Sequence, residues 1–428
     1  MNILIFTNTF TPHVGGVARS VEAFTEEYRA RGHRVLVVAP EFPEMPQNEA
    51  DVVRIPAIQN FNASDFSVVL PIHPMLSETI DAFRPDIVHS QHPFLLGMTA
   101  VRVARRRGLP LVFTHHTLYE RYTHYVPGNS PALKRFAIEL ATRYANLADQ
   151  VFAPSESIRD LLQQRGVVTP IAVVPTGVRL ENFAHGDGPA FRRQMGIPQD
   201  AFVVGHLGRL APEKNLEFLA QAVAAFIGSH PHAHFLVIGT GPSENSLRAI
   251  FSQAGVEARL HVAGILQQQA LADALHAMDL FAFASTSETQ GMVLTEAMAA
   301  GLPVVALDAP GAREVVRDRH NGRLLQEATP AAFSAALQWA AGLPADSLRD
   351  LKHAALDTAE AFSMARSADK ALACYDALKS ATTAESGEDE SAWEEVMTAI
   401  KTEWDILKSV AGAGDAALGA GLFSEKEE

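Results

Sequence analysis

Short apolar runs that alternate with helical patterns constrain the fold of this chain most strongly. Seven such runs occur in the first 180 residues, at 2–7, 34–39, 52–55, 86–89, 110–114, 150–153 and 171–175. Several are β-branched runs without polar alternation, as in a parallel sheet that is covered on both faces. Helical patterns lie between them, at 16–31, 94–107, 131–147 and 155–165. The alternation predicts a doubly wound, Rossmann-like α/β domain over residues 1–180.

The alternation starts again after the polar segment 176–189, whose Gly and Pro content is typical of a linker. Further strands are expected at 202–208, 234–238, 259–263, 279–284 and 303–307, and helices at 215–229, 243–254, 267–277, 291–300 and 330–341. We therefore predict a second doubly wound domain over residues 181–360. Because 428 residues exceed one ordinary core, we expect two domains that face each other across a cleft, the usual place for a ligand.

The C-terminal part differs in composition from these two domains. A helical stretch follows near 346–380, and we expect residues 361–381 to form a helix that packs back on the N-terminal domain. The tail, 382–428, is acidic and offers one possible amphipathic helix, Trp393–Val410. From Glu385 on, 12 acidic residues and 3 lysines contribute −9 to the net charge of −14. The rest is only mildly acidic, so nucleic acid is not expected as a partner.

Composition also bears on location. No run of 18 or more apolar residues occurs, so we expect no membrane-spanning helix. The N-terminus enters a strand without a preceding basic region, so no signal peptide is expected. The single cysteine, Cys374, excludes an intrachain disulfide and fits a reducing compartment. These features favour a cytoplasmic protein.

The stretch Ser287–Gly301 combines a loop, a helix start and two carboxylates. Glu288 lies in the loop, and Glu296 lies about one turn into the helix as the only charged residue of a long apolar run. A solitary carboxylate there is costly unless it is paired. Gly291 permits close approach of a ligand to the backbone, and the first helical N–H groups suit an anion. The pattern predicts a site for phosphate and hydroxyl groups; alternatively, Glu296 only complements the helix dipole.

Two cations, Arg209 and Lys214, follow the first strand of the second domain. Ligands of open α/β sheets bind at the carboxyl edge of the strands, where both side chains are expected. Arg offers a planar fork and Lys a point charge, and together they suit a diphosphate. The alternative is a solvated surface pair with Glu213.

In the first domain, Gly15 and Gly16 follow the first strand, where adjacent glycines allow a phosphate or a sugar to approach the backbone. The alternative is a plain strand–helix turn. His116 stands at the tip of strand 110–114 and is expected to donate or accept a hydrogen bond at a reaction centre. Its alternative is a hydrogen-bonded loop histidine.

Four histidines, His89, His92, His115 and His116, gather at strand ends of the first domain. No HExxH, CxxC or comparable spacing accompanies them, and no Asp-x-Asp follows an apolar strand. We therefore expect no metal site.

Together these residues resemble the family 4 retaining glycosyltransferases of the GT-B type, which have two Rossmann-like domains with the active site between them. The resemblance covers roughly residues 1–380. Its most specific motif is the Glu-x7-Glu pattern of Glu288 and Glu296. Further support comes from Arg209 with Lys214, from Pro175–Val178 at the linker and from the Gly15–Gly16 loop. The resemblance implies a retaining hexosyltransferase that takes a UDP-sugar and needs neither a metal nor another cofactor.

The resemblance also implies residue roles. Arg209 and Lys214 would neutralise the departing diphosphate, helped by N–H groups at Gly291, Met292 and Val293. Glu296 would bind the ribose hydroxyls, Glu288 the donor-sugar hydroxyls, and His116 would lie near the reacting carbon; Gly15 and Gly16 would also contact the donor. Since no dedicated nucleophile is evident, we expect a front-face displacement in which the leaving phosphate accepts the acceptor's proton.

One region narrows the acceptor. The stretch Thr114–Tyr125 is similar to the His-Thr-x-Tyr-x-x-Tyr-x-His-Tyr stretch of diacylglycerol glucosyltransferases. The likeness implies acceptor-side residues at Tyr119, Tyr122, His124 and Tyr125. It further implies transfer of glucose to diacylglycerol in membrane glycolipid synthesis, with the enzyme peripheral on the inner face of the cytoplasmic membrane.

Three alternatives remain at this stage. The same chemistry could act on a soluble or a polyprenyl-linked saccharide. A sugar-nucleotide epimerase also uses two Rossmann-like domains, but it would need no acceptor. A non-catalytic nucleotide-binding scaffold could use the tail as its interaction module.

Overall fold

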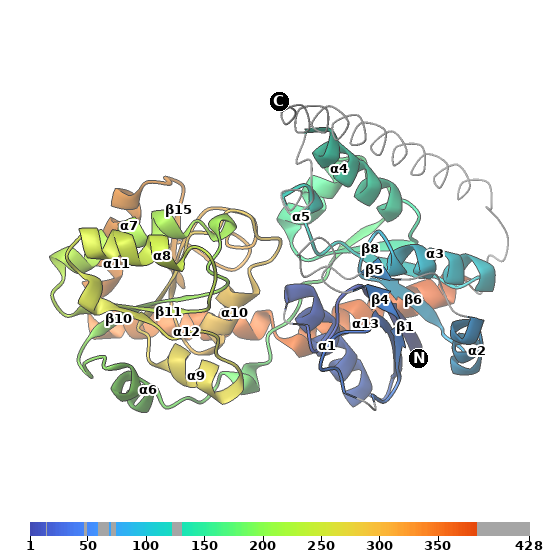
Figure 1. Ribbon diagram of the computed structural model, residues 1–428, viewed down its shortest axis with the longest axis horizontal. Helices are drawn as coiled ribbons and strands as arrows, with labels where there is room; N and C mark the ends of the chain where they lie inside the picture. The colour runs from blue at the N-terminus through green and yellow to red at the C-terminus, as the bar shows by residue number, and fades with distance from the viewer. Residues whose placement is uncertain (14, 47–48, 59–67, 70–73, 122–130, 383–428) are drawn as a thin grey trace, which may run out of the picture. The chain divides into compact units, whose positions relative to one another are not determined.

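The computed structural model describes residues 1–13, 15–46, 49–58, 68–69, 74–121 and 131–382. The chain forms two compact units (Figure 1). Its described residues fall into the first unit over Met1–Pro154, Arg159–Val173 and from Ala371 to Thr382. The second comprises Ser155–Ile158 and Val174–Lys370. The main boundary therefore falls at Val173/Val174, a few residues before the expected position 180.

The first unit is built on a seven-stranded parallel sheet with the order β3-β2-β1-β6-β7-β8-β9. Its strands are β1 (Asn2–Phe6), β2 (Arg34–Pro40), β3 (Val52–Ile55), β6 (Ile87–Ser90), β7 (Leu111–Thr114), β8 (Gln150–Ala153) and β9 (Ile171–Val173). All seven were expected from the apolar runs. The strand order reverses between β1 and β6, and the crevice at such a reversal is where open α/β sheets bind ligands.

Helices cover this sheet on both faces, as the unbroken apolar strands require. They are α1 (Gly16–Ala30), α2 (Pro74–Phe83), α3 (Leu96–Arg107), α4 (Pro131–Ala145), α5 (Glu156–Gln164) and the C-terminal part of α13 (Met364–Thr382). A small antiparallel pair, β4 (Ala57–Ile58) and β5 (Val68–Val69), and a 3-10 turn, Tyr119–Arg121, also belong to this unit. Neither that pair nor α2 was expected from the sequence.

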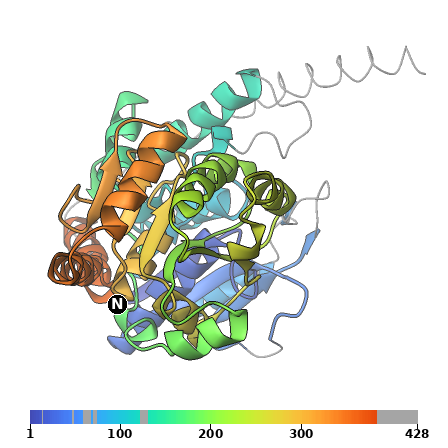
Figure 2. The ribbon, with the colours of Figure 1, turned by 90° about the vertical axis from the view of Figure 1, so that its left-hand side faces the viewer.

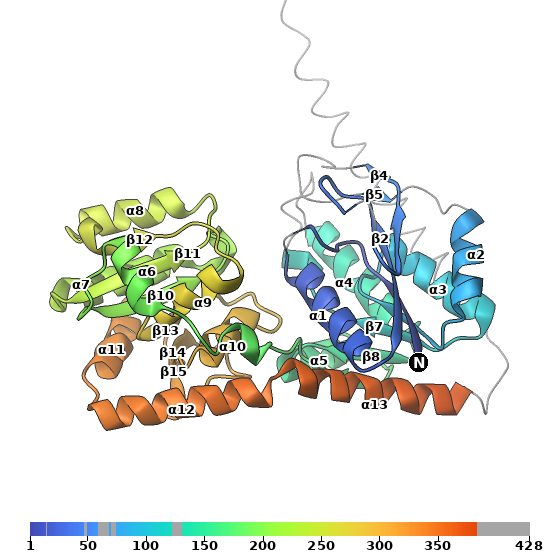
Figure 3. The same ribbon diagram turned by 90° about the horizontal axis from the view of Figure 1, so that it is seen from below.

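The end of α13 is anchored in the first unit by a buried tyrosine. The Tyr375 hydroxyl lies 2.6 Å from His89 Nδ1 and 3.3 Å from the Tyr28 hydroxyl. His89 Nε2 in turn lies 2.7 Å from the Thr114 hydroxyl, so a line of buried polar groups joins the helix to strands β6 and β7. The expected helix 361–381 corresponds to α13, which follows α12 (Ala345–Ala361) after a short break (Figure 3).

The second unit has a six-stranded parallel sheet with the order β12-β11-β10-β13-β14-β15. Its strands are β10 (Phe202–Leu207), β11 (Ala233–Ile238), β12 (Leu260–Val262), β13 (Leu280–Phe283), β14 (Val304–Leu307) and β15 (Gly322–Leu325). Its helices are α6 (Gly188–Met195), α7 (Leu216–Ser229), α8 (Glu244–Gln253), α9 (Gln268–His276), α10 (Met292–Ala299), α11 (Pro330–Ala341) and α12. Here the order reverses between β10 and β13.

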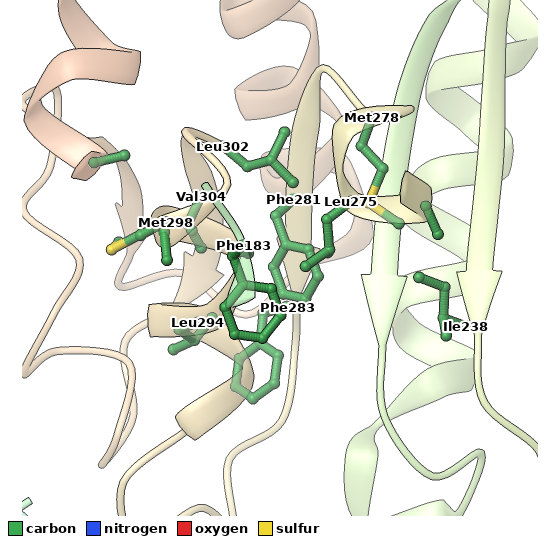
Figure 4. Close-up of a cluster of buried hydrophobic side chains, with 14 of the residues drawn as sticks. Phe183, Ile238, Leu275, Met278, Phe281, Phe283, Leu294, Met298, Leu302 and Val304 are labelled. Atoms are coloured by element: carbon green, nitrogen blue, oxygen red, sulfur yellow. The ribbon is translucent and has the colours of Figure 1, made fainter. Parts of the chain in front are cut away.

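Helices lie on both faces of this sheet (Figures 1 and 2), and a hydrophobic core packs against each face. Successive strand residues alternate between them: Val203 and Phe281 belong to one core, and Val204 and Ala282 to the other. Figure 4 shows part of the first core, where Phe281 and Phe283 meet residues of α9 and α10. Because both strand faces are buried, the strands read as continuous apolar runs.

Two elements of the second unit were not expected. The strand β15 is only Gly322–Leu325, too short and too polar to stand out as an apolar run. The helix α6 begins within the expected linker: Asp187 accepts a hydrogen bond from the Ala190 N–H, and Pro189 lies in the first turn. Such a cap and a Pro at the start are ordinary helix signals.

No helix among the described residues has the length and apolar character needed to cross a membrane.

Candidate active site

Two expected donor residues meet at the reversal of strand order in the second unit. Lys214 follows β10, Glu288 follows β13, and the two strands are neighbours. Lys214 Nζ donates a 2.5 Å hydrogen bond to Glu288 Oε1, and the Ser285 hydroxyl donates a 2.8 Å bond to the same oxygen. Both charged side chains are about one-fifth exposed. Sequence reasoning missed Ser285, since its role depends on how the loop folds.

Arg209, the second expected cation, pairs with Glu213 four residues on. Its side chain is 47% exposed, in contrast with Lys214 at 20%. The pair with Glu213 is the arrangement that the surface-pair alternative anticipated. The Glu213 side chain is only 16% exposed, so the Arg209 guanidinium is the solvent-facing member of this pair.

The helix α10 begins directly after Gly291, whose φ of 73° is a left-handed conformation that favours glycine. The N–H groups of the following residues, Met292 and Val293, have no acceptor within the helix because they lie in its first turn. Glu296, one turn further along, is only 4% exposed. Gly291, the first-turn N–H groups and Glu296 are therefore carried by one element, immediately after the loop with Glu288.

A histidine that the sequence did not single out lies behind these loops. His206, on β10, is fully buried, and its ring stacks near Phe281 and Phe283 of β13. Its Nδ1 lies 3.1 Å from the Ala282 carbonyl oxygen. Burial lowers the pKa of His206 to about 4, and the positive charge of Lys214 acts in the same direction. The ring is therefore neutral near pH 7.

The reversal of strand order in the first unit carries neutral polar groups. Gln91 follows β6 and His116 follows β7, and His116 Nε2 lies 2.6 Å from Gln91 Oε1. Since the amide oxygen can only accept, Nε2 carries the proton. Burial lowers the pKa of His116 to about 4, although the residue keeps some exposure, so the ring can take part in hydrogen bonding near pH 7 without a charge.

The glycine loop after β1 leads into α1. A Cβ added to Gly16 would meet nothing within 4 Å, whereas one on Gly15 would lie 3.1 Å from His13 Nε2. The space beside Gly16 fits both a ligand and a plain turn, so its role stays a prediction. Of the residues expected on the acceptor side, Tyr119 packs its ring against Phe94 and His115. Tyr122, His124 and Tyr125 lie outside the described residues.

The histidines expected not to bind metal are held by other contacts. His92 Nδ1 accepts a 3.1 Å hydrogen bond from the Asn8 N–H, and His89 lies between Tyr375 and Thr114. Burial lowers the pKa of His89, His92 and His115 to about 3. Over the part of the chain that the structure describes, no group of three or more His, Cys, Asp or Glu side chains is placed to hold a metal ion.

The structure thus joins Lys214 to Glu288 and sets Glu296 and Gly291 on the adjoining helix. Gly15, Gly16, His116 and Tyr119 belong to the first unit. Two parallel, doubly wound sheets in series are the architecture of a GT-B glycosyltransferase. Solved structures share it: HepE from Anabaena in complex with UDP and glucose has a TM-score of 0.70 and 22% identity, over 88% of this chain and 100% of that one.

Family models agree with the fold. The Glycosyltransferase Family 4 model matches residues 14–182, and the Glycosyl transferases group 1 model matches residues 187–356. A GDP-mannose-dependent alpha-mannosyltransferase of Mycobacterium tuberculosis is 30% identical over 76% of this chain and 84% of its own length. An alpha-monoglucosyldiacylglycerol synthase of Streptococcus pneumoniae is 29% identical over 76% of this chain and 75% of its own. The chain belongs to family 4 of the glycosyltransferases, as its motifs predicted.

Proposed function

We propose that this glycosyltransferase transfers glucose from UDP-glucose to the free hydroxyl of diacylglycerol, with retention at the anomeric carbon. The observation that carries the proposal is the Lys214–Glu288 pair beside the start of α10. A cation, a carboxylate and a helix N-terminus together suit a sugar diphosphate. The acceptor rests on the Thr114–Tyr125 stretch and on the similarity to a monoglucosyldiacylglycerol synthase.

The reaction breaks the bond between the anomeric carbon and the diphosphate oxygen and forms a bond from that carbon to the lipid oxygen. The lipid hydroxyl gives its proton to the departing phosphate on the same face of the sugar, which retains the configuration. Lys214 and Arg209 stabilise the growing negative charge, assisted by the first N–H groups of α10. Glu288 binds sugar hydroxyls, Glu296 binds ribose hydroxyls, and neutral His116 donates a hydrogen bond near the reacting carbon.

A lipid acceptor has consequences for location. Diacylglycerol stays in the membrane, so the enzyme has to reach it at the surface, peripherally on the inner face of the cytoplasmic membrane. Flotation with vesicles, with and without diacylglycerol, measures this association. Recovery of the protein only in the unbound fraction under all lipid compositions would contradict it.

A second candidate keeps the chemistry but changes the substrates. The relative from M. tuberculosis is named a GDP-mannose-dependent mannosyltransferase and is as similar as the diacylglycerol enzyme. Mannose donors, and soluble or polyprenyl-linked saccharide acceptors, are therefore the alternatives to test.

Product analysis by mass spectrometry separates these candidates. UDP-glucose, UDP-galactose and GDP-mannose are each incubated with diacylglycerol in mixed micelles, and with micelles that lack it. We expect a monoglucosyl lipid only from UDP-glucose with diacylglycerol. A mannosylated product, or UDP release that does not depend on the lipid, would refute the assignment. An isomerised sugar without transfer would point to epimerase chemistry.

A further inference from the structure

The loop that carries Glu288 is bonded to the segment by which the chain enters the second unit. Gln290, 6% exposed, lies at the end of this loop, and Thr176, 4% exposed, lies just after the unit boundary at Val173/Val174. Gln290 Nε2 donates a 2.5 Å hydrogen bond to the Thr176 carbonyl, and the Thr176 N–H donates a 2.7 Å bond to Gln290 Oε1. We call this pair of bonds the Gln290 clasp.

A second crossing of the chain is bonded to the same loop. The residues Ser155–Ile158, at the start of α5, belong to the second unit although their neighbours on both sides belong to the first. The Ser155 hydroxyl donates a 2.7 Å bond to the Thr289 carbonyl, next to Gln290. The Ser157 hydroxyl donates a 2.5 Å bond to Glu314 Oε1. The loop 285–291, which we call the donor loop, is therefore held at two consecutive residues by two different crossing segments.

The segment of Thr176 is in turn bonded to the break between α12 and α13. The Val178 N–H donates to the Phe362 carbonyl and the Met364 N–H donates to the Val178 carbonyl, both at 2.9 Å. A Cβ on Gly177 would lie 2.3 Å from Met364 Cα, so the two backbones approach more closely than a side chain would allow. This break lies a few residues before the last unit boundary, Lys370/Ala371.

We propose that Gln290 is a positioning residue for the transfer reaction. Its side-chain amide holds the donor loop rigidly against the segments by which the chain crosses between the units. Gln290 acts through its neighbours: it fixes the loop that presents Glu288 and the Gly291 turn. The inference rests on the proposed function for the role of Glu288. It assigns a role to a residue other than the two glutamates of the Glu-x7-Glu motif. It also implies that a change in the donor loop on binding alters the hydrogen bonds of the crossing segments.

An amide is the side chain that this position requires. The clasp needs one donor and one acceptor, side by side, and a neutral amide supplies both. In Gln290→Glu the ionised carboxylate still accepts from the Thr176 N–H but sets an oxygen against the Thr176 carbonyl. When that carboxyl takes up a proton, its O–H can donate to the carbonyl and the clasp forms again. In Gln290→Met, a side chain of similar length, neither bond can form at any pH.

The kinetic test uses a matched control. Asn321 is a fully buried amide of the same unit: it donates 2.7 Å and 2.9 Å bonds to the Val315 carbonyl and the Thr358 hydroxyl, and accepts one from the Arg317 N–H. Asn321→Asp therefore makes the same chemical change at a buried site of the same unit. We expect kcat/KM for UDP-glucose to fall about 10- to 100-fold in Gln290→Glu and Gln290→Met near pH 7.5, because small displacements of catalytic groups are costly. The control should stay within about threefold of the native rate.

The pH profile separates positioning from a loss of folding. Relative to the native enzyme, Gln290→Glu should regain activity as the pH falls toward about 5.5, whereas Gln290→Met should not. The charged groups near the clasp are Lys214, Glu288 and Glu314. They are the same in both variants, so they do not account for a difference between the two pH profiles. Equal losses in all three variants, or no difference between the two pH profiles, would overturn the proposal.

Hydrogen exchange tests the clasp whether or not the native protein turns over UDP-glucose. In Gln290→Met, amides of 174–178 and of 285–291 should lose protection together, by about 10-fold or more. Faster exchange in one segment alone would show that the two are not coupled. An inactive native protein would instead refute the proposed function, and the exchange result would then decide the clasp by itself.

Discussion

The two sheets reverse their strand order at one point each, and the chemistry at these two points differs. In the second unit, between β10 and β13, the side chains are charged and paired: Lys214 with Glu288, and Arg209 with Glu213. In the first unit two separate hydrogen bonds link neutral groups near the reversal between β1 and β6: the Asn8 N–H donates to His92, and His116, which follows β7, bonds to Gln91. The first unit also has a largely buried ion pair, Arg54 with Glu49, and Arg54 donates to the Thr11 carbonyl in the loop after β1. The contrast therefore concerns the side chains that follow the strands: paired ions after β10 and β13, and uncharged imidazole and amide groups after β6 and β7.

This difference matches the two halves of the proposed reaction. A diphosphate leaving group carries charge that grows as its bond breaks, so fixed cations help it most. A hydroxyl acceptor and a sugar ring carry none, and uncharged imidazole and amide groups can orient them without the cost of burying an ion. We therefore expect that removing a charge from the second unit lowers turnover far more than removing a hydrogen-bonding group from the first.

The largest effect is expected for Lys214→Ala. Removing the ammonium group leaves the departing diphosphate and Glu288 without their shared cation, and turnover should fall about 1000-fold. UDP release measured under saturating acceptor provides the readout. Lys370→Ala, at an exposed lysine of the same unit, is the control and should retain native turnover. Near-normal turnover in Lys214→Ala would show that the positive charge of Lys214 does not stabilise the leaving group.

The sequence anticipated both residues of this pair but not their contact. Lys214 and Glu288 were each placed after an apolar run, because strands of such composition are recognisable. They are 74 positions apart, and only the order of the strands makes their loops neighbours. For the same reason the Gln290 clasp, which spans 114 positions, could not be predicted.

Other limits on prediction have local causes. The edge strand β15 has two apolar residues at its end and a polar Arg323, which is too little for a run to be recognised. The helix α6 was hidden by its own start signals, Asp187 and Pro189, which also occur in linkers. His206 was overlooked because a histidine within a strand has no motif; its importance follows from burial behind Lys214 and Glu288.

A smaller effect is expected for His116→Ala. A hydrogen bond between neutral groups is worth about 1 kcal/mol, so kcat/KM should fall roughly 5- to 10-fold. Because burial holds the pKa of His116 at about 4, its ring should not titrate between about pH 5.5 and 8, and the variant and native profiles should run parallel there. His353→Ala, at an exposed histidine of α12, is the control. A step near pH 6.5 that disappears only in His116→Ala would mean that the ring works as a charged group.

The buried histidines of the first unit predict that acid lowers the stability of this unit at a higher pH than that of the second. An unfolded histidine has a pKa of about 6.5, whereas burial lowers the pKa of His89, His92 and His115 to about 3 in the folded protein. The unfolded state then binds more protons below pH 6.5, so stability is lost as the pH falls from about 6.5 toward about 3. Each such group contributes up to about 1.4 kcal/mol per pH unit in this window.

Among the described residues of the second unit, burial lowers the pKa of His206 and His234 only to about 4, and it shifts the pKa of His261 in the same direction. Hydrogen exchange at several pH values, corrected for the intrinsic exchange rate, follows the two units separately. Peptides of β6 and β7 should lose protection at a higher pH than those of β10 and β13. Loss at the same pH in both units would mean that they unfold as one, or that the buried rings are not what limits stability.

The smallest effect is expected for a chelator. In the proposed reaction the cations of the second unit do what a divalent ion does for other diphosphate leaving groups, and they are fixed to the protein. Two carboxylates of the site, Glu288 and Glu213, already bind Lys214 and Arg209, so a metal would have to displace a cation to reach them. Treatment with EDTA followed by dialysis should change UDP release by less than about twofold, and added Mg²⁺ should not raise it further. A loss of tenfold or more that Mg²⁺ restores would place a metal ion beside the diphosphate. Lys214 and Arg209 would then assist the metal ion and would not replace it.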